Sequence, residues 1–133
     1  MFKSVGVLKY SGIENPDRLV LEVDRDLYLL YRALMPNWIK LNGQRYSPHI
    51  SVVRKIIPPN LEFWGKHEDE VVEFEYSNYI HTDGRYYWIN AFSYRLEEIR
   101  SELGLELYGS NHLVHYNQTW HITIGNTKLG VLS

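Results

Sequence analysis

The sequence predicts one α+β domain made of two related halves, and three observations lead to this interpretation. First, the chain has 133 residues, of which 44% are hydrophobic and 23% charged, as expected for a single globular domain with a substantial core. Second, each half of the chain consists of predicted strands, then a helix, then a final strand. Third, the last strand of each half contains histidine, an aliphatic residue, a hydroxyl residue and a second aliphatic residue, as HISV and HITI.

The first half contains three predicted strands and one helix. The strands are SVGVLKY (4–10), RLVLEV (18–23) and the β-branched run HISVVRK (49–55). The first two flank SGIENPD, which is typical of a turn. Asp24 or Asp26 can cap a helix, and Pro36 ends it. The apolar residues of this helix recur at helical spacing, at Leu27, Leu30, Tyr31 and Leu34.

The loop-like residues 57–70 lead into a second half with the same order of elements. Its strands are VVEFEY (71–76), the two arms of NYIHTDGRYYWIN (78–90) and TWHITIGN (119–126). Asp83 and Gly84 predict the two-residue turn of a hairpin between the two arms. Ser93 can cap the second helix, and Gly104 supplies its stop. The apolar face of this helix consists of Leu96, Ile99 and Leu103.

Composition excludes several classes of function. The formal net charge of −2 provides no broad positive field, so a long nucleic-acid duplex is not expected as a partner. The absence of cysteine excludes disulfides, thiol nucleophiles and cysteine-ligated zinc. No run approaches eighteen apolar residues, and the N-terminus lacks the apolar core of a secretory signal. We therefore expect a cytoplasmic protein, with no membrane partner and no obligate protein partner.

The two histidine strands carry the chemistry. Side chains alternate between the faces of a strand, so His49 and Ser51 share one face, and His121 and Thr123 do the same. From the composition, a chain of this kind contains roughly 0.1 such tetrapeptides. An ordinary half-buried strand explains either one alone, but it explains the pair less well. If the two halves face each other, the four polar side chains converge on one pocket.

Two imidazoles and two hydroxyls suit an in-line displacement at phosphorus. One histidine removes a proton from the attacking oxygen while the other protonates the leaving oxygen, and a side-chain pKa near ~6.5 allows either role near neutral pH. The hydroxyl groups donate hydrogen bonds to the non-bridging oxygens. This chemistry requires neither a metal ion nor a cofactor. The sequence leaves open which histidine is the acid and which is the base.

The segments PHISVV and WHITIGN resemble the twin motifs of the 2H phosphoesterases, and the repeated elements extend this resemblance over most of the chain. The resemblance implies a single domain over residues 1–133, with the bilobal, LigT-like fold: two pseudo-symmetric antiparallel sheets with flanking helices around a central cleft. It also implies metal-independent cleavage of nucleotide phosphodiesters. It assigns catalysis to His49, Ser51, His121 and Thr123.

Within this family, the surroundings RYSPHISVVRK and HITIGNTK look most like the anti-CBASS nucleases of tailed phages, which degrade cyclic oligonucleotide signals. This resemblance implies a small cyclic di- or trinucleotide as the substrate and, for a phage protein, the host cytoplasm as the location. Two alternatives remain open. One is an enzyme that opens 2′,3′-cyclic phosphates or cleaves 2′-5′ bonds at RNA ends. The other is a protein that sequesters a cyclic nucleotide without cleaving it.

Tyr10 and Lys55 are the predicted substrate-binding residues outside the motifs. Tyr10 ends the first predicted strand, from where its ring can contact a base. Lys55 has the same strand parity as His49, whereas Arg54 has the opposite parity, as Lys128 has relative to His121. Unbroken alternation therefore favours Lys55 as the cation that contacts phosphate.

A zinc site is a competing interpretation, because His112 and His115 precede His121 at short spacings. The first two histidines lie in a predicted loop without a nearby carboxylate, and a zinc site leaves His49 unexplained. The acidic segment HEDE (67–70) is interpreted as a solvated turn, with metal binding as the lesser alternative. We therefore predict no metal site.

Overall fold

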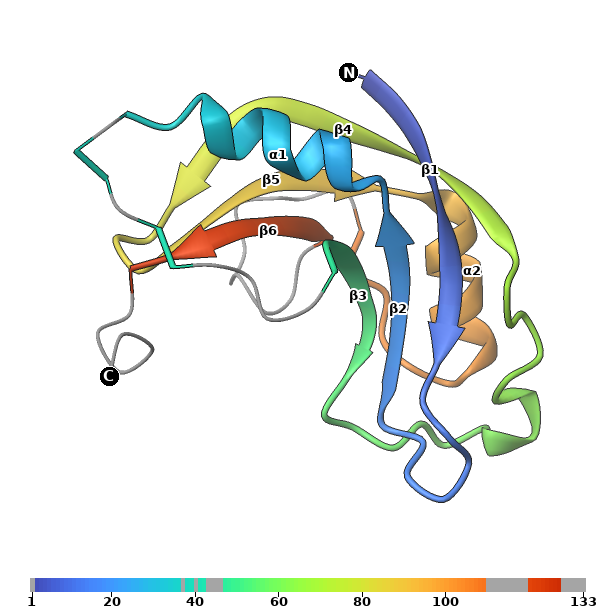
Figure 1. Cartoon of the computed structure of the whole chain (residues 1–133). Helices are drawn as coiled ribbons and strands as arrows, with labels where there is room; N and C mark the ends of the chain where they lie inside the picture. The colour runs from blue at the N-terminus through green and yellow to red at the C-terminus, as the bar shows by residue number, and fades with distance from the viewer. Residues whose placement is uncertain (1, 37, 40, 43–46, 110–119, 128–133) are drawn as a thin grey trace.

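The structure is a computed structural model that describes residues 2–36, 38–39, 41–42, 47–109 and 120–127. These residues form an α+β fold with six antiparallel strands and two α-helices (Figure 1). The elements are β1 (Phe2–Tyr10), β2 (Arg18–Val23), α1 (Arg25–Ala33), β3 (His49–Arg54), a short 3-10 helix (Leu61–Phe63), β4 (Val71–Thr82), β5 (Tyr86–Phe92), α2 (Tyr94–Glu102) and β6 (His121–Asn126). This order confirms the predicted repeat, except that a 3-10 helix is added and that VVEFEY and the first hairpin arm form one continuous strand, β4. No helix in the described part of the chain is long and apolar enough to cross a membrane.

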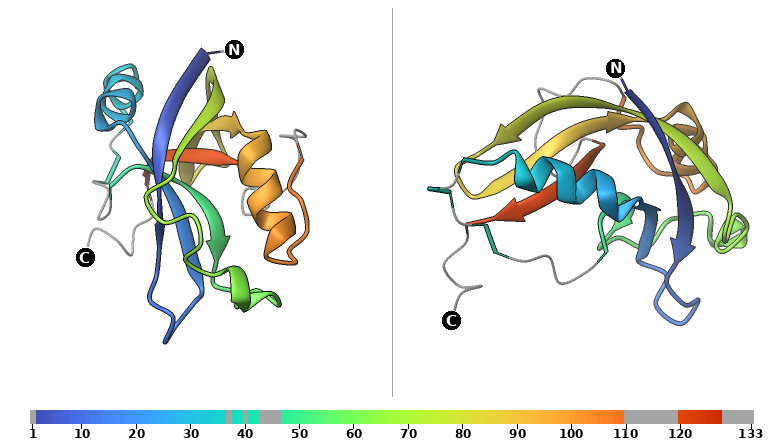
Figure 2. Two further views of the ribbon diagram at one scale, coloured as in Figure 1. Left: turned by 90° about the vertical axis from the view of Figure 1, so that its right-hand side faces the viewer. Right: turned by 45° about the horizontal axis from the view of Figure 1, so that its top comes forward.

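The six strands close into a barrel in the order β1-β2-β3-β6-β5-β4, with β1 paired to both β2 and β4. The three strands of each half are therefore contiguous, and the halves meet at two seams, β3 with β6 and β1 with β4. In the left panel of Figure 2 the two helices lie on opposite sides of the strands. Helix α1 contacts β6, and helix α2 contacts β3 and β4. Each helix thus packs against the histidine strand of the other half.

One row of aliphatic side chains runs across five strands and forms the centre of the core. Each member is the cross-strand neighbour of the next one, across the strands β1, β2, β3, β6 and β5. The members are Leu8, Leu21, Ile50, Ile122 and Ile89. All five are fully buried. Burial of each such side chain stabilises the fold by about 1.5–3 kcal/mol. The row crosses the seam between the halves, so the two halves share one core.

Helix α1 begins at its predicted cap but buries a different face from the predicted one. The Asp24 carboxylate accepts a hydrogen bond from the backbone N–H two residues later, at 2.8 Å. The buried residues of the helix are Tyr28 and Tyr31, whereas Leu30 and Leu34 are 56% and 62% exposed. The two tyrosines face the core, and this rotates the two leucines toward solvent. The predicted apolar face was therefore wrong at Leu30 and Leu34.

Helix α2 confirms its sequence prediction. The Ser93 hydroxyl accepts a hydrogen bond from the Leu96 N–H at 3.3 Å, which is the predicted N-cap. Leu96, Ile99 and Leu103 are at most 1% exposed. Gly104 has a φ of +82°, a left-handed conformation that ends a helix at low cost only for glycine. Local capping signals and helical periodicity thus fix the helix completely.

The hairpin between β4 and β5 forms as predicted, but its turn lies one residue later. The ladder register places Gly84 and Arg85 at the tip, and Gly84 has a φ of +91°. Asp83 lies just outside the tip, where its carboxylate accepts hydrogen bonds from the N–H groups of Arg85 and Tyr86 at 2.9 and 2.8 Å. The aspartate therefore stabilises the turn through its side chain and does not occupy a central turn position.

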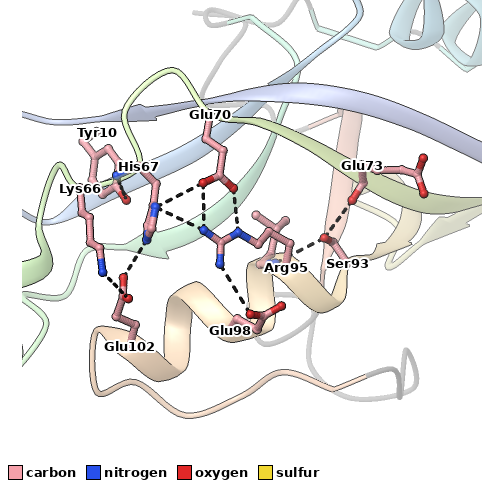
Figure 3. A network of polar contacts seen from close by, with 10 residues as sticks. Tyr10, Lys66, His67, Glu70, Glu73, Ser93, Arg95, Glu98 and Glu102 are labelled. Atoms are coloured by element: carbon pink, nitrogen blue, oxygen red, sulfur yellow. Dashed lines mark hydrogen bonds and ion pairs between the residues drawn. The ribbon is translucent and has the colours of Figure 1, made fainter.

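The segment 67–70 forms a turn with Glu68 and Asp69 exposed, as predicted, but His67 and Glu70 make ionic contacts with α2 (Figure 3). The His67 side chain is 12% exposed and contacts Glu102 at 2.8 Å and Glu70 at 3.2 Å. Arg95 of α2 donates from Nε and Nη2 to the two Glu70 oxygens, at 2.7 and 2.9 Å. These hydrogen bonds from Arg95 hold the pKa of Glu70 below its usual value. The cationic Arg95 explains why Glu70 packs against the helix, whereas Glu68 and Asp69 remain exposed.

Candidate functional site

The two histidine strands are direct neighbours, and their register brings the four motif residues together. Strand β3 pairs antiparallel with β6 through Ile50 and Ile122. This register places Ser51 across from His121 and His49 across from Thr123. All four side chains lie on the face opposite the aliphatic row, which we call the histidine face. The two histidines are diagonal neighbours, for which a separation of about 7–8 Å is typical.

Each histidine strand contains a β-bulge at the same position, the third residue after histidine. In β3, Ser51 pairs with Val20 but Val53 pairs with Leu19, so the residue between them, Val52, has no partner on β2. In β6 the corresponding shift leaves Ile124 without a partner on β5. A bulge adds one residue to one strand and reverses the alternation beyond it. The internal repeat therefore extends to the backbone irregularities of the two strands.

The bulge in β3 overturns the parity argument that favoured Lys55. Arg54 pairs with Arg18 beyond the bulge, and this register returns both residues to the histidine face. Strand β3 ends at Arg54, and Lys55 lies exposed beyond it with a φ of +55°. The structure thus places two arginines near His49, one of which the sequence reasoning had assigned to the other face. No residue type in HISVVR signals the bulge.

His49 is oriented by a backbone carbonyl and lies in an environment that disfavours its protonation. Its Nδ1 lies 2.8 Å from the carbonyl oxygen of Ser47. Since a carbonyl only accepts, Nδ1 carries the proton and the lone pair of the neutral ring is on Nε2. Burial lowers the pKa of His49 below 6.5, and the charges of Arg18 and Arg54 add to this effect. The Ser47 hydrogen bond and the Glu22 carboxylate oppose it. The ring is therefore neutral at neutral pH.

The neighbours of His121 on β5 differ from those of His49 on β2 and include an aromatic and an amide side chain. Its cross-strand neighbour on β5 is Asn90, and the two residues are 7% and 4% exposed. The Asn90 amide accepts a hydrogen bond from the Trp88 indole at 3.1 Å and contacts His81 Nε2 at 2.9 Å. The Trp88 ring centre lies 6.5 Å from that of His121 and 6.0 Å from that of His81. Burial lowers the pKa of His81, which keeps this ring neutral beside the Asn90 donor.

Tyr10, predicted as a substrate contact, lies on the opposite face from the histidines. It pairs with Leu19, and its ring packs edge-on against Trp64 at 5.0 Å. Its hydroxyl accepts a hydrogen bond from the His67 backbone N–H at 3.3 Å, and burial raises its pKa to about 12. The parity of β1 explains this placement, because Lys9 and not Tyr10 lies on the histidine face. The structure does not bring Tyr10 to the four motif residues.

The sequence reasoning also missed His81, Trp88 and Asn90. Their alternate positions in the predicted hairpin were a usable signal, since residues 86, 88 and 90 must share one face of β5. The pairing of β5 with β6, which brings these residues beside His121, could not be predicted from the sequence. The residues of the competing zinc interpretation, His112 and His115, lie outside the described residues, as does Lys128. Within the described ranges, no group of three or more histidine, aspartate or glutamate residues is arranged to hold a metal ion.

No protein-family model, curated protein or solved structure matches this chain. The interpretation of the site therefore rests on its own geometry and on the motif resemblance. The geometry has three parts: two histidines on paired strands, a hydroxyl residue across from each, and arginines near one of the two rings. Such a set of groups can supply a base, an acid and a cationic anchor for chemistry at a phosphate.

Proposed function

We propose that this protein is a metal-independent phosphodiesterase of the 2H type that cleaves 3′-5′ bonds in cyclic di- or trinucleotide signals. The register of β3 and β6 carries this proposal, since it sets His49 beside Thr123 and His121 beside Ser51 on one face. In a tailed phage, such an activity removes the alarm signal of CBASS immunity in the cytoplasm of the host. The proposal requires no cofactor and no protein partner.

His49 is the general base and His121 the general acid in the proposed reaction. The neutral His49 ring takes the proton of the ribose 2′-OH through Nε2, and the 2′ oxygen attacks the adjacent phosphorus. The bond to the 5′ oxygen breaks, and His121 donates a proton to that leaving oxygen. The products are an opened chain with a 5′-OH and a 2′,3′-cyclic phosphate. Ser51 and Thr123 donate hydrogen bonds to the non-bridging oxygens, where negative charge accumulates.

The groups around the site support a small anionic nucleotide as the substrate. Arg18 and Arg54 bring two positive charges close to His49, where a phosphate must lie. Trp88 offers an indole ring beside His121, on which a base can stack. The net charge of −2 gives no extended basic surface, so these local charges favour a compact ligand over a duplex.

The twofold organisation of the chain supports the bilobal fold that the motif resemblance implies. Each half supplies three contiguous strands and one helix. Each histidine strand has its bulge at the same distance from its histidine. In this proposal the two halves are the two lobes, which meet at the seam of β3 and β6, and the cleft lies over the histidine face.

The decisive experiment compares substrates and histidine variants in the presence of EDTA. We expect the wild-type protein to linearise cyclic di- or trinucleotides faster than it opens RNA 2′,3′-cyclic ends or cleaves 2′-5′ bonds. His49→Ala and His121→Ala should each lower turnover by at least about 10²-fold. His67→Gln is the matched control, because this histidine contacts α2 and not the histidine face.

Three outcomes separate the alternatives. Preferential opening of RNA ends assigns the enzyme to end processing. Recovery of intact cyclic nucleotide from the denatured complex, without turnover, identifies a sequestering protein. Full turnover by either alanine variant of the motif histidines contradicts the acid–base mechanism. Product mass and folded-state circular dichroism of each variant complete the comparison.

A further inference from the structure

The last turn of each helix carries an arginine that donates to the bulge of the opposite half. Arg100 of α2 donates from Nη1 to the carbonyl oxygen of Val52, the bulge residue of β3, at 2.6 Å. Arg32 of α1 donates from Nη1 to the carbonyl oxygen of Ile124, the bulge residue of β6, at 3.2 Å. The two contacts are equivalent, and both cross from one half of the chain to the other.

Each arginine also binds the segment that follows its own helix. Arg32 donates from Nη2 to the Leu41 carbonyl at 2.8 Å and from Nη1 to the Asn42 carbonyl at 3.1 Å. Arg100 donates from Nε to the Glu106 carbonyl at 2.7 Å, and its guanidinium lies 4.0 Å from the centre of the Tyr108 ring. Both side chains therefore join three parts of the molecule: a helix, the chain after it, and a histidine strand.

The bulges need such partners for a physical reason. The residue inserted at a bulge has no counterpart on the neighbouring strand, and Val52 and Ile124 are both fully buried. A buried carbonyl without a hydrogen bond costs about 1–3 kcal/mol. A guanidinium supplies a charge-assisted hydrogen bond and is rigid enough to reach several acceptors at once. The two arginines thus stabilise each bulge by providing its buried carbonyl with a hydrogen-bond donor.

We propose that Arg32 and Arg100 are positioning residues, each of which sets the geometry of the opposite half's histidine strand through the carbonyl group of its bulge residue. This inference rests on the proposed function for its kinetic consequences. Val52 directly follows Ser51, and Ile124 directly follows Thr123, so a displaced bulge moves the hydroxyl residue and the histidine two positions before it. Arg100 therefore acts on the His49 strand and Arg32 on the His121 strand.

The test uses Arg32→Lys and Arg100→Lys, which keep the charge but lose the planar set of donors. With a cyclic dinucleotide, we expect kcat to fall about 10- to 100-fold in each variant while KM changes little, because the bound phosphate is held but misaligned. Arg25→Lys on α1 and Arg95→Lys on α2 are the matched controls, and both should keep wild-type kcat. Arg25 is exposed, and Arg95 contacts Glu70, away from the histidine strands.

Histidine ring signals in ¹H–¹⁵N spectra provide a readout that does not depend on activity. Arg100→Lys should shift the His49 signals more than those of His121, and Arg32→Lys should do the reverse. Equal shifts in both rings, or larger shifts in the histidine of the same half, overturn the proposal. So does a kcat within about twofold of wild type in both variants, since a positioning role predicts about 10-fold or more.

Milder variants keep the test valid if a lysine variant does not fold. Tyr108→Leu removes the ring beside the Arg100 guanidinium, and Tyr28→Phe removes a hydroxyl that accepts from Arg32 Nη1 at 3.1 Å. Each should produce a smaller shift with the same crossed pattern. If the wild-type protein cleaves no cyclic nucleotide, the proposed function fails while the spectra still decide the role of the arginines. If it cleaves them and no crossed pattern appears, only the positioning role fails.

Discussion

Strands β3 and β6 have the same sequence of backbone features but different neighbouring side chains. Both place histidine, a hydroxyl residue and then a bulge in the same order. The neighbour of His49 across β2 is Glu22, and arginines 18 and 54 lie close by. The neighbour of His121 across β5 is the uncharged, buried Asn90. The repeat therefore produces two strands with equivalent backbones, and the side chains around their histidines differ.

This difference teaches how two equivalent histidines acquire separate roles. A proton acceptor must be neutral in the resting state. The half-buried His49 meets that condition, because arginines lie nearby and its Nδ1–H donates to the Ser47 carbonyl. The sequence made the two rings interchangeable, because both motifs read alike. Their surroundings in the fold distinguish them, and the following experiments challenge that distinction from the largest expected effect to the smallest.

The largest effect concerns the roles of acid and base. With a cyclic dinucleotide, His49→Ala and His121→Ala should each lower kcat by about 10²–10⁴-fold. With a nucleoside 3′-(p-nitrophenyl) phosphate, the leaving group needs no proton, so His121→Ala should recover most of its activity while His49→Ala stays impaired. Release of nitrophenolate measures the rates. Recovery in His49→Ala instead would exchange the two roles.

The second effect concerns a packing difference beyond the two bulges. Strand β6 has Gly125 where β3 has the fully buried Val53. A Cβ atom on Gly125 would lie 2.9 Å from the Leu41 Cβ and 3.2 Å from Arg32 Nη1. Gly125→Ala should therefore reduce the free energy of unfolding by about 1–3 kcal/mol.

Urea denaturation measures this loss, with Ser101→Ala on the exposed side of α2 as the control. The control exchanges a side chain without crowding a neighbour. An unchanged denaturation midpoint in Gly125→Ala would show that the chain around Leu41 can move to accommodate the added methyl group at little cost in free energy. In that case β6 would tolerate the same residue size as β3 at this position.

The third effect concerns the support of α2 by segment 67–70. The pKa of Glu70 is lowered by its hydrogen bonds to Arg95, so the carboxylate contributes stability above its ordinary pKa of 4.5. That contribution is lost as the pH falls through the lowered pKa of the folded state. Glu70→Gln should cost about 1 kcal/mol at pH 7, because the contact is partly exposed, and almost nothing at the acid end of this window.

Unfolding curves over a pH series test this dependence. Glu62→Gln, at an exposed glutamate of the 3-10 helix, provides the control. A loss of stability in Glu70→Gln that is constant with pH would mean that the Glu70 charge does not carry the contact. The support of α2 would then come from packing alone.

The smallest effect concerns the charges around His49. Glu22 raises the pKa of His49 and Arg54 lowers it, so Glu22→Gln and Arg54→Gln should move the acidic limb of kcat/KM in opposite directions. The limb shifts to lower pH in the first variant and to higher pH in the second. If the limb shifts in the same direction in both variants, or does not shift in either, the limb does not report the ionisation of His49. That result would favour His121 as the base.

Local signals predicted the elements well, because each depends on residues close in sequence. The Ser93 cap, the Leu96, Ile99 and Leu103 face and the Gly104 stop together define α2 without any tertiary information. Helix α1 was harder, since its tyrosines and leucines offer two apolar faces and the choice between them depends on what lies beneath. The hairpin turn moved by one residue because Asp83 stabilises the tip from outside it.

In the candidate site, too, the sequence predicted what depends on local alternation and failed where tertiary structure decides. Alternation along a strand correctly paired His49 with Ser51 and His121 with Thr123 on their faces. The same rule failed for Lys55, because a bulge shifts the register by one residue without a sequence signal. Tyr10 was assigned to the site from its place at a strand end, although its parity directs it to Leu19.

The sequence by itself determined the repeat, the ends of most elements and the identity of the four motif residues, since these follow from local periodicity and residue chemistry. Only the tertiary structure decided that β3 pairs with β6, that arginines and not a lysine approach His49, and that each helix holds the other half's bulge. These features depend on strand register and on contacts between residues 48 and 92 positions apart. Such long-range contacts arise from the packing of the whole chain, and no local pattern encodes them.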